Sequence, residues 1–268
     1  MTRADALLAG VAAGLPAVGL ADVPALMSRV DRKYVVPVSV MARLAAELGD
    51  DVAVLRIGTR RQFRYSSTYF DTGDLLTFRQ HRQGRRRRFK IRTRTYLDGG
   101  GRWLEVKLSG AGRGTDKHRM PYGSGPGDAL TGEALDFVSG TLRDGLRLPL
   151  PDGLEPVLTT DYRRVTLVDR RGAARVTCDT GLVCRDGTGT ARARGDHVLL
   201  ESKSCGGGSG VDAVLRGLGV RPVGVSKYCL GVARLRGAPA NPWHAVLRRL
   251  FEDRPAAPAP GRAAARNP

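Results

Sequence analysis

Charged and apolar residues alternate along residues 85–97, which read RRRRFKIRTRTYL. Successive side chains of a β-strand point to opposite faces of a sheet, so this period of two predicts a strand with two different faces. One face carries Arg86, Arg88, Lys90, Arg92, Arg94 and Tyr96, and the other carries Phe89, Ile91, Thr93, Thr95 and Leu97. We therefore expect a strand that packs on one side and presents cations on the other.

The same design recurs elsewhere in the chain. Residues 103–109 place Trp103, Glu105, Lys107 and Ser109 opposite Leu104, Val106 and Leu108. Further shared faces are formed by Arg29, Asp31 and Lys33, by Tyr162, Arg164 and Thr166, by Arg175, Thr177 and Asp179, and by Leu199, Glu201 and Lys203. Neighbouring strands are expected to present these charges together.

The pattern predicts many strands and a few helices. Strands are expected at residues 28–36, 62–70, 85–97, 103–108, 116–121, 157–168, 174–179 and 197–203. Helical spacing of apolar residues appears at 38–48, 74–80, 128–148, 211–218 and 241–252. There is no repeat and no long internal linker, which favours one main domain.

Two arrangements of these strands fit the alternation. An antiparallel sheet with one face in water is the commonest arrangement for such a pattern. Alternatively, the sheet closes into a barrel, so that cations from opposite walls converge on an anionic ligand and the few carboxylates hold a metal ion. The alternation alone leaves both arrangements open.

The charge balance narrows the class of partner. The chain of 268 residues is 41% hydrophobic, and 44 Lys and Arg against 26 Asp and Glu give a formal net charge of +18. A field of that sign favours polyanions such as nucleic acid, an acidic membrane surface or polyphosphate. An aromatic content of 6% disfavours a dedicated platform for single-stranded nucleic acid. The Walker A pattern of P-loop proteins is missing.

Cysteines, histidines and the apolar start of the chain add little chemistry. The four cysteines form no CxxC pair, which favours a reduced, cytoplasmic setting over a structural zinc site. The four histidines show no spacing typical of metal ligands, and none is assigned a role. Residues 7–20 are apolar but interrupted by Pro16 and several glycines, so they predict neither a signal peptide nor a membrane span.

A set of short motifs occurs in a recognisable order. These are RVDRKY, RFKIRTRTY, WLEVKL, DKHRMPY, LEPVLTTDYRRVTL, ARVTCDTGL, VLLESKS and VSKYCLG, between about residues 28 and 231. The ordered set resembles the catalytic VTC domain, a branch of the CYTH-like triphosphate tunnel metalloenzymes. The resemblance implies an α+β fold, with an antiparallel tunnel of eight β-strands and flanking helices. It also implies a metal-dependent phosphotransferase that adds the γ-phosphate of ATP to inorganic polyphosphate, with Mn²⁺ or Mg²⁺ as cofactor.

The resemblance also sets expected boundaries and roles. Residues 1–27 would form a helical segment, 28–236 the tunnel domain, 237–253 a helix and 254–268 a disordered tail. The catalytic cations carried over are Lys33, Arg92, Arg94, Lys107, Arg164, Arg175 and Lys227; the phosphate-binding residues are Lys117, Tyr162, Lys203 and Ser226; the metal ligands are Glu201 and Glu105. Guanidinium groups suit phosphate because they donate two parallel hydrogen bonds and stay charged at any working pH.

Several roles have simpler alternatives. Glu105 either binds the metal or forms an ion pair with Lys107 or Arg94 inside a cationic wall. Residues 85–88 are expected to lie partly outside the wall as a solvated rim that attracts polyanions. Asp31 stands where the tunnel families more often carry Glu, which shortens the carboxylate by one methylene and argues against a metal role there.

Three functions remain open. Besides the polymerase, the same tunnel would suit a triphosphatase, in which water replaces the phosphate chain as nucleophile, or a non-catalytic binder of polyanions. The expected partners are ATP and inorganic polyphosphate, and a membrane partner protein acting in trans. The expected location is cytoplasmic, with peripheral attachment at the inner face of the membrane as a further option.

Overall fold

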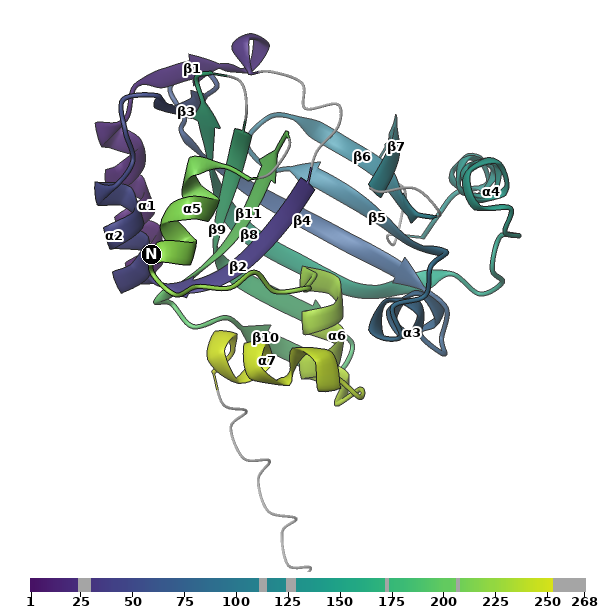
Figure 1. Ribbon diagram of the computed structural model, residues 1–268. Coiled ribbons are helices and arrows are strands. Elements are labelled where there is room, and N and C mark those ends of the chain that lie inside the picture. The colour runs from purple at the N-terminus through teal and green to yellow at the C-terminus, as the bar shows by residue number, and fades with distance from the viewer. Residues whose placement is uncertain (24–29, 111–114, 124–128, 172–173, 206–207, 253–268) are drawn as a thin grey trace, which may run out of the picture.

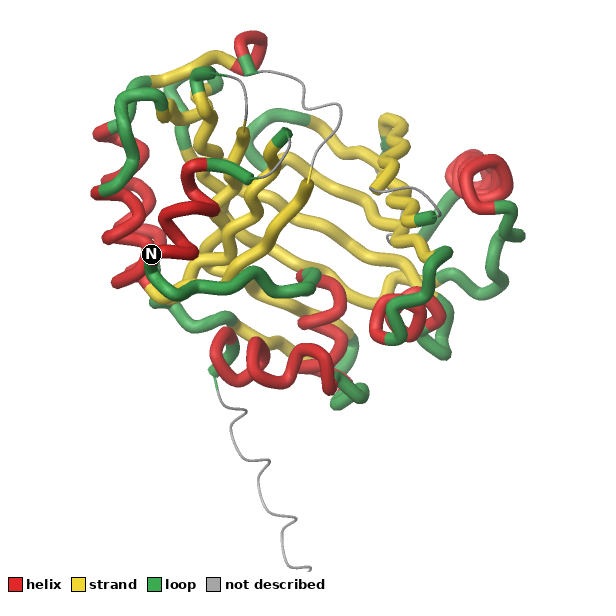
Figure 2. The backbone as a smooth tube through the Cα atoms, in the orientation of Figure 1, coloured by secondary structure: helices red, strands yellow, loops and turns green. Residues whose placement is uncertain are grey.

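Eight strands form the main sheet of the computed structural model, which describes residues 1–23, 30–110, 115–123, 129–171, 174–205 and 208–252. Their order is β2 (Val30–Pro37), β11 (His197–Ser204), β9 (Ala174–Asp186), β8 (Glu155–Asp169), β4 (Gln62–Asp71), β5 (Arg88–Tyr96), β6 (Gly101–Ser109) and β7 (Thr115–Pro121). All neighbours on this path are antiparallel, as the sequence predicts, and the strands curve around a common interior (Figures 1 and 2).

The sheet is not closed into a complete barrel. Within the described residues its two end strands, β2 and β7, do not pair with each other, so one side of the tunnel has no backbone ladder. The eight-stranded antiparallel tunnel fold that the resemblance implies is thus confirmed, with a curved wall that is open on one side rather than closed as a barrel.

Three short strands complete the sheet, and a short turn follows the first of them. β1 (Ala17–Gly19) pairs in parallel with β3 (Val52–Arg56), β3 pairs with β8, and β10 (Gly189–Arg192) pairs with β9. A 3-10 turn, η1 (Leu20–Asp22), follows β1. None of these short elements is predicted by the sequence pattern, because segments this short carry too few apolar positions to show a period.

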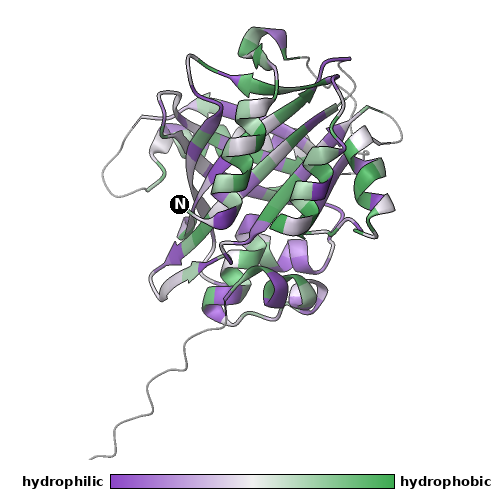
Figure 3. Cartoon of the chain, turned by 90° about the vertical axis from the view of Figure 1, so that its left-hand side faces the viewer, coloured by the Kyte–Doolittle hydropathy of each residue, from purple (hydrophilic) through white to green (hydrophobic). Residues whose placement is uncertain are grey.

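Helices cover the outside of the wall. α1 (Arg3–Gly14), α2 (Val38–Ala46) and α5 (Gly210–Gly217) pack on the face formed by β2, β11, β9 and β8, through a cluster that includes Leu8, Met41, Leu215, Val165 and Val198. Figure 3 shows this side, with hydrophobic and hydrophilic residues both present on its helices. α4 (Gly132–Leu146) covers the other outer face, where Phe89, Ile91, Leu104, Val106 and Leu108 are buried against it. The apolar faces predicted for β5 and β6 are thus confirmed.

The third apolar cluster closes one end of the interior. α3 (Leu76–Arg82), α6 (Lys227–Arg236), η3 (Asn241–Trp243) and α7 (His244–Leu250) meet inward residues of β4, β8 and β9 there (Figure 1). Gly231 allows α6 to approach closely, because a Cβ at this position would lie 2.6 Å from Leu158 Cδ2 and 3.0 Å from Cys184 Sγ. α6 is not among the predicted helices. The helix begins at the Ser226–Lys227 pair, which the resemblance assigns to phosphate binding: Ser226 is its N-cap and Lys227 its first residue.

Other predicted elements fall close to their expected positions. The helices predicted at 38–48, 74–80, 128–148, 211–218 and 241–252 correspond to α2, α3, α4, α5 and the pair η3 and α7. β9 runs seven residues beyond its predicted end at residue 179. The predicted tail, 254–268, lies outside the described residues, as do the first residues of the strand expected at 28–36. No helix in the described part of the chain is both long and apolar enough to cross a membrane.

A buried carboxylate joins three elements at the closed end. Asp71, at the end of β4, is fully buried and accepts hydrogen bonds from the backbone N–H groups of Thr77 at 2.8 Å and Phe78 at 3.0 Å, and from the Thr77 hydroxyl at 2.8 Å. The Tyr228 hydroxyl of α6 donates to the same carboxylate. Asp71 therefore serves as the missing N-terminal cap of α3, since Leu75 provides no side-chain cap.

Replacing Asp71 with Ala should lower the free energy of unfolding by about 2–4 kcal/mol, because several buried donors lose their acceptor at once. Urea denaturation measures this loss. Asp74→Ala is the matched control, since Asp74 lies beside the same helix but its side chain is 63% exposed. Equal destabilisation by the two changes would contradict the role given to Asp71.

Candidate functional site

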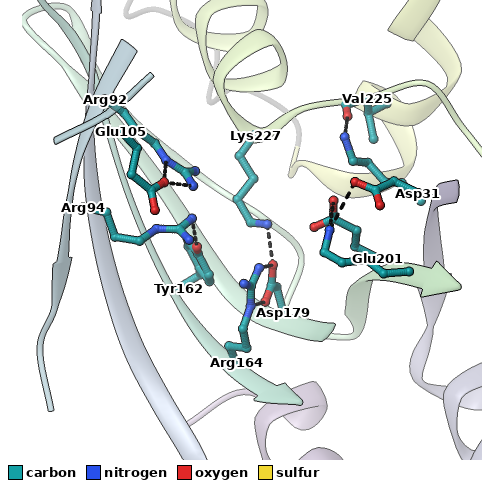
Figure 4. A network of polar contacts seen from close by, with 12 residues as sticks. Asp31, Arg92, Arg94, Glu105, Tyr162, Arg164, Asp179, Glu201, Val225 and Lys227 are labelled. Carbon is teal, nitrogen blue, oxygen red and sulfur yellow. Dashed lines mark hydrogen bonds and ion pairs between the residues drawn. The ribbon is translucent and has the colours of Figure 1, made fainter. Parts of the chain in front are cut away.

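The inward face of the sheet carries charge on almost every strand. The cations that the alternation and the pairing register place on this face are Lys33, Lys90, Arg92, Arg94, Lys107, Lys117, Arg119, Arg164, Arg175 and Lys203, and Lys227 of α6 joins them; the carboxylates are Asp31, Glu105, Asp179 and Glu201. Figure 4 shows side chains from both parts of the wall pointing into the same space. Every predicted site residue except Ser226 belongs to this wall or lines it.

Arg92 is fixed by a buried ion pair. Its Nε and Nη2 donate to Glu105 Oε2 at 2.8 and 2.6 Å, and its Nη1 donates to the Tyr69 hydroxyl at 3.0 Å. Lys117 Nζ lies 3.4 Å from the other carboxylate oxygen of Glu105, which is fully buried. Burial alone would raise the pKa of Glu105, but Arg92, Arg94 and Lys117 hold the pKa well below its usual range. Both oxygens are engaged, which favours the ion-pair alternative for Glu105 over metal binding.

A second buried pair lies on the other part of the wall. Arg164 Nε and Nη2 donate to Asp179 Oδ1 and Oδ2 at 2.6 and 2.7 Å, and Lys227 Nζ forms an ion pair with the same carboxylate (Figure 4). Burial would raise the pKa of Asp179, but Arg164 and Lys227 outweigh it and lower the pKa. Nearby, Arg94 donates to the Tyr162 hydroxyl at 2.9 Å. The guanidinium groups of the wall are therefore held in place before any ligand arrives.

Asp179 is missing from the sequence-derived site. Its signal was present, because it shares a strand face with Arg175 and Thr177, but only the pairing register places it directly opposite Arg164.

Ser226 has a different position from the one its motif suggests. Its hydroxyl accepts from the backbone N–H of Cys229 at 3.1 Å and so caps α6, which sends Lys227 toward Asp179.

Two carboxylates on adjoining strands share one ammonium group. Lys203 Nζ lies 2.8 Å from Glu201 Oε1 and 3.3 Å from Asp31 Oδ2, while Lys33 Nζ donates to the carbonyl of Val225 at 2.9 Å (Figure 4). Burial would raise the pKa of Glu201, but Lys203, Lys33 and Lys107 hold it well below its usual range. Glu201 is thus ionised, as a metal ligand must be.

The donor set of Asp31 and Glu201 fits a hard divalent cation. Both residues offer carboxylate oxygens, which Mg²⁺ and Mn²⁺ prefer. Together they already bind one cationic group, the ammonium of Lys203. No group of three or more His, Cys, Asp or Glu residues with metal-binding geometry occurs in the described part of the chain. An ion held here would therefore take the rest of its shell from ligand oxygens and water, as Mg²⁺ commonly does with phosphate substrates.

Three lysines form a row with little compensating negative charge. Lys107 on β6 lies directly between Lys90 on β5 and Lys117 on β7 in the pairing register. Burial, with Lys33, Arg88 and Arg92 nearby, lowers the pKa of Lys90 to about 8. Arg92 and burial lower the pKa of Lys107 well below its usual range. Among the residues that the structure describes, only Lys117 of the three has a carboxylate within ion-pair distance, and that carboxylate is already held by Arg92.

Polar atoms without partners lie on the inward face beside Arg94. Ser67 Oγ, Thr160 Oγ1 and Arg94 Nε are buried and have no hydrogen-bond partner within the described structure. Ser67 lies directly opposite Arg94 on one side and Thr160 on the other, so the three polar groups form one row across β5, β4 and β8. Buried donors without acceptors are rare in proteins, and their presence in a cationic wall fits a site that receives an oxyanion.

Comparison with known proteins gives a family and a set of similar folds. The chain is similar to a candidate adenylyl cyclase from Hippeastrum with a dominant triphosphatase activity, at 13% identity and a TM-score of 0.47, covering 77% of this chain and 96% of that one. A candidate adenylate cyclase from Bacillus halodurans is 15% identical, with a TM-score of 0.44 and coverage of 75% and 96%. No curated protein matches the chain.

The sequence also matches a family model. The model of the VTC domain aligns with residues 28–236, a region that contains all eight strands of the wall as well as α6 with Lys227. Its limits coincide with those that the ordered motifs predict for the tunnel domain. The chain belongs to the VTC domain family.

Proposed function

We propose that this chain transfers the γ-phosphoryl group of ATP to the end of an inorganic polyphosphate chain, with Mg²⁺ or Mn²⁺ as cofactor. The observation that carries the proposal is the row of Lys90, Lys107 and Lys117, whose charges the protein itself leaves largely unbalanced. A phosphate chain supplies the missing negative charge along its whole length. The membership in the VTC domain family supports the same substrate class.

The proposed reaction needs little covalent chemistry from the protein. A terminal oxygen of the phosphate chain attacks the γ-phosphorus of ATP, the bond to the bridging oxygen of ADP breaks, and ADP leaves with that electron pair. Arg92, Arg94 and Arg164 stabilise the charge that spreads over the transferred group, because their partners already fix their orientation. A bound divalent ion at Asp31 and Glu201 would add further charge neutralisation.

The test uses purified protein with ATP and Mn²⁺, with and without a short polyphosphate primer, followed by phosphorus NMR. Growth of mid-chain phosphate signals together with ADP is the expected result. Orthophosphate as the only new product would replace the polymerase with a triphosphatase. Intact ATP with either metal, despite binding of tripolyphosphate, would favour the non-catalytic binder.

Glu201→Gln should reduce turnover by about 100-fold or more while the protein stays folded, because an amide gives the metal a weaker, uncharged ligand. Binding of Mn²⁺, followed by electron paramagnetic resonance without substrate, should weaken in the same variant. The control is Glu47→Gln, an exposed position at the end of α2. Unchanged Mn²⁺ binding in Glu201→Gln would remove Glu201 from the metal site.

The pKa of Lys90 predicts a pH dependence of binding. Lys90 has a pKa of about 8 in the folded protein, below the ordinary value of 10.5, so its protonated form destabilises the free protein. The free energy of unfolding should therefore rise with pH between about 8 and 10.5. An anion reverses that preference, so affinity for tripolyphosphate should fall as the pH rises through about 8.

Calorimetric titration with tripolyphosphate on both sides of that pH measures the effect. Lys90→Met should show a smaller change with pH than the unmodified protein. The ligand's own titration is the same for both proteins and cancels in the comparison. An identical pH dependence in the two proteins would exclude Lys90 as the titrating group.

A further inference from the structure

A groove of about 480 Å³ lies outside the tunnel, between α3 and the start of β5. It is lined by Leu76, Arg79, Gln80, Gln83, Arg85, Arg86, Arg87 and Leu148. Half of these residues are arginines, and none is acidic or aromatic. Residues 85–87 of the groove belong to the segment 85–88, which is expected from the sequence to form a solvated rim.

The guanidinium groups of the groove are only weakly compensated. Arg79 pairs with Asp74 at 2.7 Å. Arg85 Nε donates to Gln83 Oε1 at 2.9 Å, and Arg87 Nη1 donates to the carbonyl of Leu146 at 3.3 Å, so both face neutral acceptors. Arg86 has no hydrogen-bond or ion-pair partner among the described residues. The groove therefore concentrates positive charge that the protein does not balance.

The backbone around these arginines is well defined. The N–H of Arg85 donates to the carbonyl of Gln80 at 2.9 Å, and the N–H of Gly84 donates to that of His81 at 3.2 Å. Gly84 has a φ of +64°, a left-handed conformation that glycine adopts without strain and that turns the chain from α3 into β5. Arg88 Nη1 donates to the carbonyl of Arg85 at 2.8 Å, which ties the groove to the first residue of β5.

In the chain, the arginines of the groove directly precede the inward cations of β5. Arg88, Lys90, Arg92 and Arg94 share the inward face of β5, and alternate side chains on a strand follow each other at about 6.8 Å. Arg85, Arg86 and Arg87 precede this row in the chain, and no acidic residue lies among them. A phosphate chain held by the row would therefore meet further cations of the groove close to the start of β5.

We propose that the groove binds the part of an inorganic polyphosphate chain that extends beyond the tunnel. This proposal rests on the function proposed above. Guanidinium groups match tetrahedral phosphate oxygens in geometry and charge. Nucleic acid is the less suitable polyanion, because no aromatic side chain in the groove can stack on a base. The groove would hold long chains without contributing to the binding of a triphosphate.

The test compares two ligands and two variants. Arg85→Glu combined with Arg86→Glu changes the groove, while Arg170→Glu combined with Arg192→Glu makes the same change in net charge at exposed positions whose side chains have no partner among the described residues. Isothermal titration at fixed low salt measures affinity for tripolyphosphate and for a long polyphosphate of defined length. Thermal denaturation verifies that both variants are folded.

The groove variant should bind long polyphosphate about tenfold more weakly and tripolyphosphate as well as the unmodified protein does. Equal losses in both variants would reduce the groove to general electrostatic attraction and overturn the proposal. In the same titration repeated with single-stranded RNA, loss of affinity for the RNA but not for polyphosphate would assign the groove to a different polymer. If long polyphosphate binding depends on the groove while tripolyphosphate does not bind at all, the groove is supported and the function proposed for the tunnel fails.

Discussion

Burying many cations inside one sheet requires internal counter-charges, and the wall depends on two of them. Glu105 and Asp179 are almost completely removed from water, and each binds a guanidinium through two hydrogen bonds. An unpaired buried charge is strongly destabilising, so each carboxylate stabilises the arginine that it holds in the interior. The two pairs allow a folded interior that remains strongly cationic.

The paired and unpaired cations have different physical properties. Arginine keeps its charge in almost any environment, and the pairs fix its planar group in one orientation. Lysine responds to its surroundings, and burial lowers the pKa of Lys90 to about 8. The wall thus combines rigid donors with lysines whose protonation depends on pH. Below about pH 8 the protonated Lys90 adds to the repulsion inside the free protein, and a bound anion would relieve that repulsion.

The alternation of charged and apolar residues predicted the fold well and the site in part. Period-two patterns are local, so the two faces of β5 and β6 could be predicted from the sequence, as could the cations at 92, 94 and 107. The role of Asp179 depends on strand register, and the pairing of Glu105 with Arg92 rather than Lys107 depends on which residue lies directly opposite. Each of these registers is set within a hairpin by its turn, and the period-two pattern alone does not specify which residues lie opposite each other. The ordered motifs indicated the family. They did not indicate Ser67 and Thr160, whose buried hydroxyl groups have no hydrogen-bond partner in the described structure.

The edges of β2 and β7, which pair with no further strand in the described part of the chain, have a consequence for contacts between molecules. Exposed strand edges recruit strands from other molecules unless something opposes them, and charged side chains are a common safeguard. Asp31, Arg32 and Lys33 on β2 and Lys117, His118 and Arg119 on β7 place such charges along both edges. A second sheet approaching either edge would meet these side chains first. The residues that make the interior attractive to an anion therefore also protect the open seam against edge-to-edge aggregation.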